Sequence, residues 1–434
     1  MSFARSRMPR MIGSLLAVIL VGILVAGCGG SQSAPQSSQS SASTKASESS
    51  KPAESAKPSA SASAPAANKD PLKVGMILTL TGPQGSIGTK QQLGLQMALE
   101  EINAAGGIMG RKVELIERDD GGDPTKARTA AQELVEKNGV TLIIGTTISS
   151  PALAIMPYLT EQKVFLLGSH SADATNDPQK YPYAFTGSPL ASLQAAVVAK
   201  YPIDVLKTKK IAILAESSAY GNSMVPAYKQ VLTDAGVQPV AVEQYPQGAT
   251  DMTTQLTNLR KAGAEAILGG TLAADSVRII KNLQSMGWEV PYLGNSDLAT
   301  TAVVEGAGLE AMKKVYSYNQ TQLSFSDKVQ IPAKTKEFAA KLSKKLNQSP
   351  LKESILQPSL YYDLGYMLKW AVEKAQSTEG PKVAAVLETL KDFQGAHATF
   401  TFTKDNHCGL DLSDMVMVKA ASMKDGVFEL APGY

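Results

Sequence analysis

Hydroxyl-bearing residues are concentrated in the segment Gly145-Thr146-Thr147-Ile148-Ser149-Ser150-Pro151. The segment follows an apolar run of strand length, residues 140–144, and precedes an apolar pattern of helical spacing that includes residues 153–159. Hydroxyl donors beside the free backbone N–H groups of a helix start can bind a carboxylate. Alternatively, Ser149 or Ser150 is an ordinary N-cap with a proline in the first turn. The residues therefore indicate either an anion site or a capped helix.

The glycine-rich segment from Thr81 to Gly88 lies between another strand pattern and another helix pattern. Its glycines follow the spacing G-x-x-G-x-x-G, whereas dinucleotide-binding loops use G-x-G-x-x-G. The next strand ends in Glu117-Arg118-Asp119-Asp120, which is not a clear ribose-binding pattern. We therefore expect no dinucleotide site, and the segment is either a flexible strand-to-helix turn or a ligand-binding loop.

Motifs for covalent or metal chemistry are missing from the chain. No G-x-S-x-G, H-E-x-x-H or C-x-x-C pattern occurs, and the aspartates at 119, 120 and 123 lack EF-hand spacing. The histidines, His170, His397 and His407, have no metal-ligand spacing, although His170 lies in a candidate binding loop and is either a ligand donor or an ordinary polar residue. Cys408 lies beside His407 without a third group to orient the pair. We therefore expect no enzymatic activity, no metal and no cofactor.

Strand patterns and helix patterns alternate along the rest of the chain. Before the turn-rich stretch Gly187-Ser188-Pro189, the apolar runs of strand length are residues 74–78, 113–116, 140–144 and 164–167. After that stretch, the runs are residues 211–214, 240–242, 266–268 and 291–293. This alternation predicts an α/β fold with two doubly wound parallel-sheet lobes. Ligands bind such lobes beyond the carboxyl ends of the strands, where the loops described above lie.

The N-terminus has the pattern of an export signal. Arginines precede an apolar stretch that begins at Met11, and small residues precede Cys28. This order predicts a secretory signal peptide over residues 1–27. The cut site resembles the lipobox of bacterial lipoproteins, and the resemblance implies that Cys28 carries lipid and anchors the chain outside the cytoplasm. A plain signal peptide and a single membrane anchor are the alternatives.

Residues 29–70 consist almost entirely of Ser, Ala, Pro, Gln, Lys and Glu, and such a segment buries too little apolar surface to offset its chain entropy. We therefore predict a disordered tether behind the lipidated cysteine over residues 28–70, and a folded domain over residues 71–434. The formal net charge of +3 is accounted for by the signal arginines, so no nucleic-acid surface is expected. Once Cys28 is lipidated, Cys408 has no partner for an intramolecular disulfide.

Several segments of the folded part match the motifs of one family. They are Leu80-Thr81-Gly82-Pro83 with Ile87-Gly88, the run from Ile102 to Lys112, Asp119-Asp120, the helix start Asp123-Pro124-Thr125-Lys126-Ala127, Tyr181-Pro182-Tyr183-Ala184-Phe185, Tyr220-Gly221, Tyr362-Asp363, and Asp405-Asn406-His407 with Gly409. On these residues the chain resembles the branched-chain amino acid binding proteins of ABC importers. That family has the type I periplasmic binding protein fold, and the resemblance covers about 72 to 434.

The resemblance implies two lobes joined by three crossovers, with the ligand in the cleft between them and closure by a hinge motion. By register, we expect the crossovers near Gly187 to Pro189, near Ser317 to Gln320, and near Phe400 to Lys404. Lobe 1 then comprises about 72–188 and 320–401, and lobe 2 about 189–319 and 402–434.

The resemblance also implies ligand contacts. Ser149, with the backbone around Thr147 and Ile148, would meet a ligand carboxylate. The pair Ser171-Ala172 stands where the family has a small residue followed by a hydroxyl residue that binds the ligand ammonium, so one hydroxyl is lost. Tyr220 would close over the ligand from the second lobe, or it is simply a packing residue.

Other positions depart from the family pattern. Ile87 and Thr271 replace aromatic walls, and Ser296 occupies the position of the acid that pairs with the ammonium. Asp297 follows directly, and it either replaces that acid or is the N-cap of a helix that begins near Ala299. These departures leave amino acids, short amides and aromatic or branched carboxylates open as ligands.

The expected function is therefore that of an extracytoplasmic lipoprotein that captures such a solute and delivers it to the permease of an ABC importer. A ligand sensor of the same fold, which presents its closed form to a membrane receptor or kinase, is the alternative. The expected partners are the solute, the permease subunits and the membrane lipid reached through Cys28, and we expect a monomer.

Overall fold

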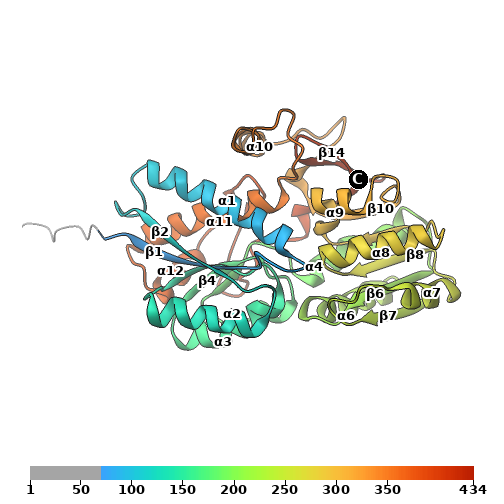
Figure 1. Ribbon diagram of the computed structural model, residues 1–434, viewed down its shortest axis with the longest axis horizontal. Coiled ribbons are helices and arrows are strands. Elements are labelled where there is room, and N and C mark those ends of the chain that lie inside the picture. Colours follow the sequence, from blue (N-terminus) through green and yellow to red (C-terminus); the bar gives the residue numbers. More distant parts are fainter. Residues whose placement is uncertain (1–69) are drawn as a thin grey trace, which may run out of the picture. The chain divides into compact units, whose positions relative to one another are not determined.

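The computed structural model describes residues 70–434, which are coloured in Figure 1. The predicted signal peptide, the predicted lipidation site Cys28 and the predicted tether as far as residue 69 lie outside the described residues. Within the described part, no helix combines the length and the apolar character needed to cross a bilayer.

The first lobe is built on a parallel sheet with the strand order β2-β1-β3-β4-β5. Its strands are β1 (Leu72–Leu78), β2 (Val113–Asp119), β3 (Leu142–Gly145), β4 (Phe165–Gly168) and β5 (Ala184–Thr186). In β1, Val74 and Met76 belong to the hydrophobic core on one face, and Ile77 belongs to the core on the other. Both faces are therefore buried, which explains the continuous apolar runs in the sequence.

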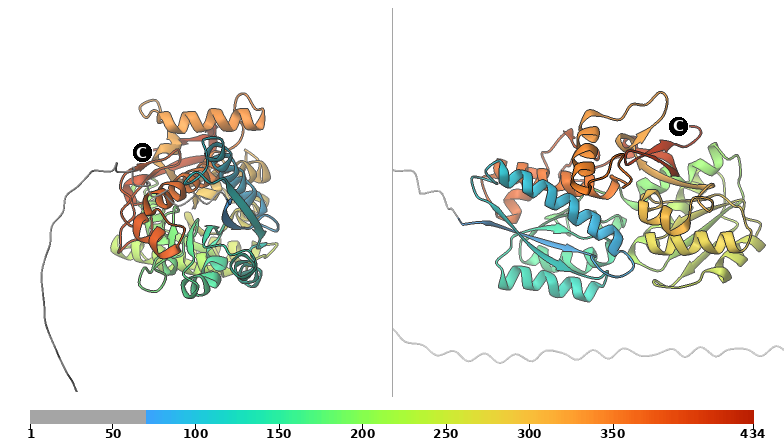
Figure 2. Two further views of the ribbon diagram at one scale, coloured as in Figure 1. Left: turned by 90° about the vertical axis from the view of Figure 1, so that its left-hand side faces the viewer. Right: turned by 45° about the horizontal axis from the view of Figure 1, so that its top comes forward.

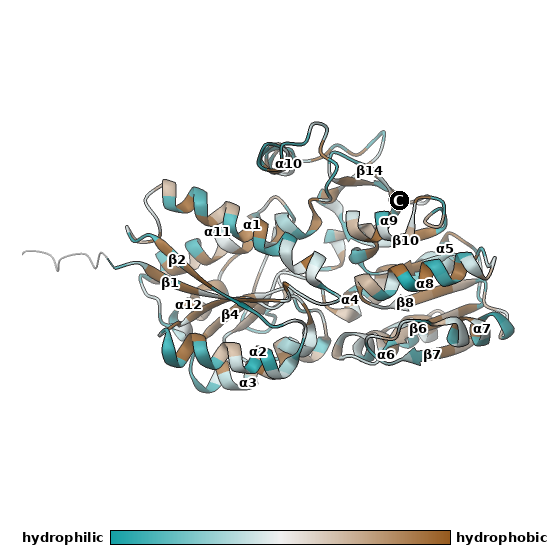
Figure 3. Cartoon of the chain, in the orientation of Figure 1, coloured by the Kyte–Doolittle hydropathy of each residue, from teal (hydrophilic) through white to brown (hydrophobic). Residues whose placement is uncertain are grey.

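Helices cover both faces of this sheet, and Figure 3 shows the apolar strands between helices that carry polar outer surfaces. One face is covered by α1 (Gly85–Ala104), α11 (Leu356–Ala375) and α12 (Gly380–Leu387), and the other by α2 (Pro124–Gln132) and α3 (Ser149–Glu161). The carboxylate of Asp123 accepts the backbone N–H groups of Thr125 and Lys126 and so caps α2, as the Asp-Pro pattern predicts. A π-helical turn, Glu133–Lys137, follows α2.

The second lobe is built on a sheet with the strand order β11-β15-β14-β10-β9-β8-β6-β7. The parallel strands are β6 (Ile211–Glu216), β7 (Ala241–Tyr245), β8 (Ala266–Gly270), β9 (Tyr292–Gly294) and β10 (Val315–Gln320). The edge of the sheet beyond β10 is formed by three more strands. They are β14 (Met415–Lys424), which runs antiparallel to β10, then β15 (Val427–Leu430), which runs antiparallel to β14, and the short β11 (Ser324–Phe325), which runs parallel to β15. Figure 2 shows these C-terminal strands in red beside the green and yellow lobe. The prediction of parallel sheets therefore omitted an antiparallel hairpin.

The second lobe also has helices on both faces of its sheet. They are α4 (Ala191–Val198), α5 (Lys200–Asp204), α6 (Ala219–Asp234), α7 (Thr253–Lys261), α8 (Ala273–Ser285) and α9 (Thr301–Ala307). Short 3-10 turns are Asp173–Thr175, Ser296–Ala299, Thr321–Leu323 and Leu412–Asp414. The remaining elements are the helix α10 (Ala333–Leu346) and the strands β12 (Phe393–Gln394) and β13 (Thr399–Phe400).

The structure places two of the three passages between lobes later than the family register suggested. The chain leaves the first sheet at Thr186 and enters α4 at Ala191, around the first expected crossover. It remains in the second sheet through β11, beyond the expected second crossover near Ser317 to Gln320.

The third passage also differs from its expected position near Phe400 to Lys404. Phe402, Cys408 and Leu410 still lie in the core of the first lobe, and Thr186 forms a bridge with Cys408. The lobe boundary at 320 is therefore wrong because the chain stays in the second sheet through β11. The boundary at 401 is wrong because apolar side chains in residues 402–410 complete the core of the first lobe before the chain reaches β14.

Candidate functional site

A cavity of about 60 Å³ lies between the two lobes, at the carboxyl ends of their central strands. The first lobe contributes residues from the start of α1, the loops after β3 and β4, and the start of α11, namely Gln84, Ile87, Thr147, Ile148, Ser149, Ser169, Ser171 and Gln357. The second lobe contributes Gln194, Tyr220, Leu272, Asn295, Ser296, Asp297 and Tyr318, and Ser188 comes from the first passage between lobes.

The structure brings together all of the site residues named from the sequence except Ala172 and Thr271. Ala172 is buried, and its backbone N–H donates to Ser149 Oγ at 3.0 Å. Thr271 Oγ1 lies 2.6 Å from the hydroxyl of Tyr292 and 2.8 Å from Ser276 Oγ, inside the second lobe. Thr271 is therefore placed beside the cavity, and its neighbour Leu272 lines it instead.

The start of α3 forms one end of the cavity and offers hydrogen-bond donors. Ile148 occupies the N-cap position, and no side chain caps the helix. The alternative of a serine N-cap is therefore wrong, since Ser149 is already the first helical residue. Ser149 Oγ instead accepts the N–H groups of Ser171 and Ala172, both at 3.0 Å, which leaves its own proton free to donate. An uncapped helix start with hydroxyl groups beside it is suited to an anion.

Asp297 forms the acidic part of the cavity. Gln357 Nε2 donates to its Oδ1 at 3.3 Å and Asn295 Nδ2 to its Oδ2 at 3.5 Å, and no cationic side chain of the described residues pairs with it. Burial raises the pKa of Asp297 to about 6, while the hydrogen bonds from Asn295 and Gln357 lower it. Asn295 Oδ1 and Gln84 Oε1 are also buried and have no hydrogen-bond partner in the described part of the chain. This region of the cavity therefore offers acceptors to a cationic or N–H-bearing group.

Asp297 is not the helix cap that the sequence left as an alternative. It lies within the 3-10 turn Ser296–Ala299, and the N-cap position of α9 is Thr300, which makes no side-chain cap bond. The hydroxyl of Thr300 donates instead to the backbone carbonyl of Asp297 at 2.7 Å. The carboxylate of Asp297 therefore caps no helix and lines the cavity, where it can contact a ligand.

Tyr220 closes the cavity from the second lobe. Its side chain is buried, and its hydroxyl donates to Gln194 Oε1 at 2.7 Å. Tyr318 lies nearby and receives a hydrogen bond from Ser296 Oγ at 3.2 Å. The aromatic side chains therefore belong to the wall of the second lobe, opposite the start of α3.

Sequence reasoning missed Gln84, Ser169, Ser188, Gln194, Leu272, Asn295, Tyr318 and Gln357. Gln84 lies within the glycine-rich segment, and Asn295 begins the loop that contains Asp297, so both follow predicted strands. Gln194, Tyr318 and Gln357 lie inside helices or strands, and no local pattern distinguishes them from packing residues.

Asp173 connects the lobes beside the cavity. Its Oδ1 accepts the backbone N–H and the hydroxyl of Ser192 on α4 at 3.1 and 2.7 Å, and its Oδ2 accepts the hydroxyl of Ser223 on α6 at 3.0 Å. Ser150 Oγ accepts the N–H of Ala219 at 3.2 Å in the same region. These bonds join the lobes across the cleft in the arrangement described here.

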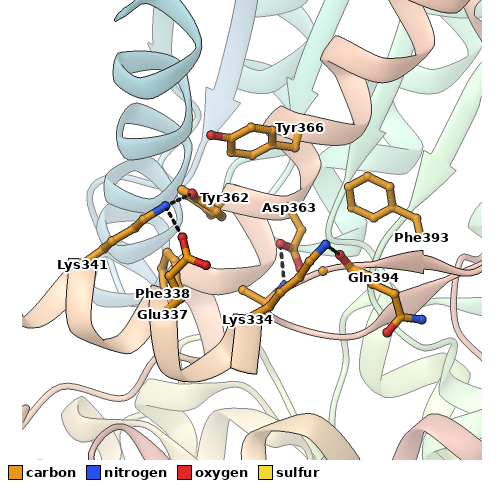
Figure 4. Close-up of a pocket in the computed structure, with 11 residues that line it drawn as sticks. Lys334, Glu337, Phe338, Lys341, Tyr362, Asp363, Tyr366, Phe393 and Gln394 are labelled. Atoms are coloured by element: carbon orange, nitrogen blue, oxygen red, sulfur yellow. Dashed lines mark hydrogen bonds and ion pairs between the residues drawn. The ribbon is translucent and has the colours of Figure 1, made fainter. Parts of the chain in front are cut away.

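A larger cavity of about 330 Å³ lies away from the cleft, between α10, α11 and β12 (Figure 4). Its charged groups are already paired: Lys341 with Glu337 at 3.0 Å, Lys334 Nζ with the carbonyl of Gln394 at 2.6 Å, and Asp363 with the N–H groups of Ala396 and His397. The cleft is therefore the better candidate site, because it combines unpaired buried acceptors with an uncapped helix start.

The histidines and Cys408 lie outside both cavities. Burial lowers the pKa of His170 to about 4 and that of His397 to about 3, so both are neutral, and His407 Nδ1 lies 3.0 Å from the carbonyl of Ala184. Cys408 is buried, which raises the pKa of its thiol to about 11. His170 is therefore not a cavity donor, and Cys408 is not a reactive thiol.

Residues 71–424 match the family described as periplasmic binding protein. Leu/Ile/Val-binding protein homolog 3 from Brucella melitensis is 27% identical over 342 residues, which cover 79% of this chain and 89% of that protein. A type 1 periplasmic binding protein from Bordetella pertussis has a TM-score of 0.75 at 25% identity, over 84% of this chain and 100% of that one. The branched-chain amino acid transporter substrate-binding protein from Streptococcus pneumoniae, solved with isoleucine, has a TM-score of 0.72 at 24% identity, over 83% and 99%. These structures confirm the predicted two-lobed α/β fold.

Proposed function

We propose that this chain, which belongs to the periplasmic binding protein family, captures an amino acid or a similar small carboxylate or amide and delivers it to the permease of an ABC importer. Members of the family are extracytoplasmic substrate-binding proteins of transporters and not enzymes, so the expectation of a non-catalytic chain is confirmed by its family. The identity of the ligand and its delivery to a permease are what we propose beyond family membership.

The observation that carries the proposal is the polarity of the cleft. Donors at the start of α3 and at Ser149 lie at one wall. The other lobe contributes Asp297, which has no cationic partner among the described residues, and Asn295, whose Oδ1 has no hydrogen-bond partner there. A zwitterion with a carboxylate and an ammonium complements both walls at once. It also contacts both lobes, so its binding favours the closed arrangement over an open one.

The proposal includes a lipid anchor at Cys28 and a monomeric chain. The anchor is supported by the small residues before Cys28 and by the polar segment that follows it. A tether of that composition would let the binding domain reach a permease in the same membrane.

A thermal-shift screen of the full chain tests the proposal, with amino acids, short amides and small carboxylates as separate sets. A ligand at 100 times its dissociation constant stabilises the folded state by about 2.7 kcal/mol, which raises the unfolding midpoint by several degrees. Recovery of the ligand chemically unchanged is the expected companion result. A screen in which no member of the three sets raises the midpoint would contradict the proposed solute class.

A further inference from the structure

A second cavity of about 180 Å³ adjoins the ligand cavity, between the starts of α1 and α9 and the residues that precede α11. Ile87 and Gln357 line both cavities. One water molecule needs about 10–15 Å³ of such space, so the ligand cavity of about 60 Å³ has room for little more than a carboxylate and an ammonium. A longer ligand must therefore extend past Ile87 and Gln357 into the second cavity.

Gln357 is held in place at the boundary between the two cavities. Its Oε1 accepts a hydrogen bond from Gln91 Nε2 at 2.9 Å, and its Nε2 donates to Asp297 at 3.3 Å. Both ends of the amide are therefore engaged, which fixes its orientation. The boundary then consists of a positioned amide on one side and the buried side chain of Ile87 on the other.

The second cavity is lined by four residues with hydroxyl groups. The hydroxyls of Thr300, Thr301 and Ser354 already make hydrogen bonds within the protein, and Ser86 is exposed. Thr301 Oγ1 accepts the N–H of Ser354 at 2.9 Å, and Ser354 Oγ donates to the carbonyl of Ala299 at 3.2 Å. A ligand group in this cavity therefore meets chiefly the charged side chains that line it, Lys90, Glu305 and Glu353.

These charged side chains carry a net negative charge. Lys90 Nζ pairs with Glu353 Oε2 at 2.5 Å, and the Glu353 side chain is only 13% exposed. Glu305 belongs to no ion pair among residues 70–434 and lies at the exposed rim. Two carboxylates thus face one ammonium, which favours a ligand group that brings a positive charge.

We propose that the ligand is an α-amino acid whose side chain ends in a cationic group, and that this group lies in the second cavity between Glu305 and Glu353. This inference rests on the proposed function and names its substrate class. An aliphatic side chain of the same length would put apolar surface beside the largely buried carboxylate of Glu353 and would supply no charge to complement Glu305. The chain would then differ in ligand from the relatives named after leucine, isoleucine and valine.

Calorimetry on the full chain at pH 7.5 tests the inference by comparing lysine with norleucine, which lacks only the side-chain ammonium. We expect lysine to bind about tenfold more tightly, the factor that corresponds to 1.4 kcal/mol of charge-assisted hydrogen bonding. Glu305→Gln should reduce this ratio about threefold, as expected for loss of a partly exposed ion pair. The matched control is Glu310→Gln, which neutralises an exposed carboxylate outside both cavities and should leave the ratio unchanged.

The outcomes separate this inference from the proposed function. Norleucine or leucine binding as tightly as lysine would overturn the cationic side chain and leave amino acid capture intact. A lysine preference that Glu305→Gln does not reduce would overturn the assigned position of the cationic group. If no amino acid binds but a small carboxylate or amide does, this inference fails and the proposed function stands. If no member of the three sets binds, both fail.

Discussion

Replacing Asp297 by asparagine should weaken amino acid binding and stabilise the empty protein at the same time. The substitution keeps the shape of the side chain and removes its charge. In the structure this carboxylate has only long hydrogen bonds from Gln357 and Asn295, at 3.3 and 3.5 Å, and no cationic partner among the described residues. A ligand ammonium would supply that partner.

The loss of binding follows from leaving a buried charge unpaired. Removing one partner of a buried charge pair costs about 2 to 5 kcal/mol. At 1.4 kcal/mol for each factor of ten, the dissociation constant of an amino acid should therefore rise by about 30-fold to several thousand-fold.

The gain in stability follows from the raised pKa of Asp297. An increase from 3.8 to about 6 corresponds to at most about 3 kcal/mol of destabilisation at pH 7.5, since each pKa unit is worth 1.36 kcal/mol. The Asp297 carboxyl group keeps its proton to a higher pH in the folded state than in the unfolded state. The contribution of Asp297 to the free energy of unfolding therefore falls as pH rises from about 4 to 6. Asp297→Asn should match the wild type below pH 4 and exceed it above pH 6.

The same titration makes binding of an ammonium ligand depend on pH. Only the ionised carboxylate pairs with the ammonium, so the affinity of the wild type should fall about tenfold for each pH unit below 6. Glu216 lies nearby, but burial raises its pKa to about 8, so it stays neutral through this range. Asp297→Asn should show no such decline between pH 6 and 4.5.

Calorimetry from pH 4.5 to 8, combined with denaturant unfolding of the empty protein, checks these effects together. The matched control is Asp251→Asn, which makes the same chemical change at an exposed aspartate outside the cleft. This control should leave the affinity and its pH dependence as they are in the wild type. Wild-type affinity for an amino acid in Asp297→Asn would refute the ammonium role. A variant that loses stability at pH 7.5 would refute the argument from the raised pKa.

The remaining predictions concern the other end of the cavity, the lobes and the anchor. Ser149→Ala should weaken carboxylate binding by roughly 1 to 3 kcal/mol in calorimetry, less than Asp297→Asn, because helix N–H donors remain; an unchanged affinity would remove Ser149 from the site. Saturating ligand should reduce the radius of gyration in solution scattering, and identical profiles would argue against hinge closure. Asp173→Ala should speed ligand release in stopped-flow measurements, because it removes the bonds to Ser192 and Ser223, and an unchanged rate would show that these bonds do not hold the lobes together. Cys28→Ser should abolish partition into the detergent phase, and a wild-type chain that stays in the aqueous phase would contradict the lipid anchor.

Much of the fold was predictable because its determinants are local. Continuous apolar runs mark strands buried on both faces, and Asp123 before Pro124 marks the start of α2. The β14–β15 hairpin was harder to predict, since its side chains include polar residues and its place beside β10 depends on contacts between distant segments. The passage after Phe400 was misplaced for the same reason, because Phe402 and Cys408 join a core whose other members lie far away in sequence.

The sequence by itself determined which loops meet the cleft, since a loop that follows a parallel strand must lie at the carboxyl edge of the sheet. Ser149 was named on that ground, and Asp297 was named because it follows the position of the family acid. Their roles stayed ambiguous because a serine or aspartate near a helix start is equally suited to capping. Only the tertiary structure decided that neither side chain caps a helix. It also brought Gln357 of α11 against Asp297 and opened a cavity beyond Ile87, because the volume of a cleft depends on how separately folded lobes approach each other.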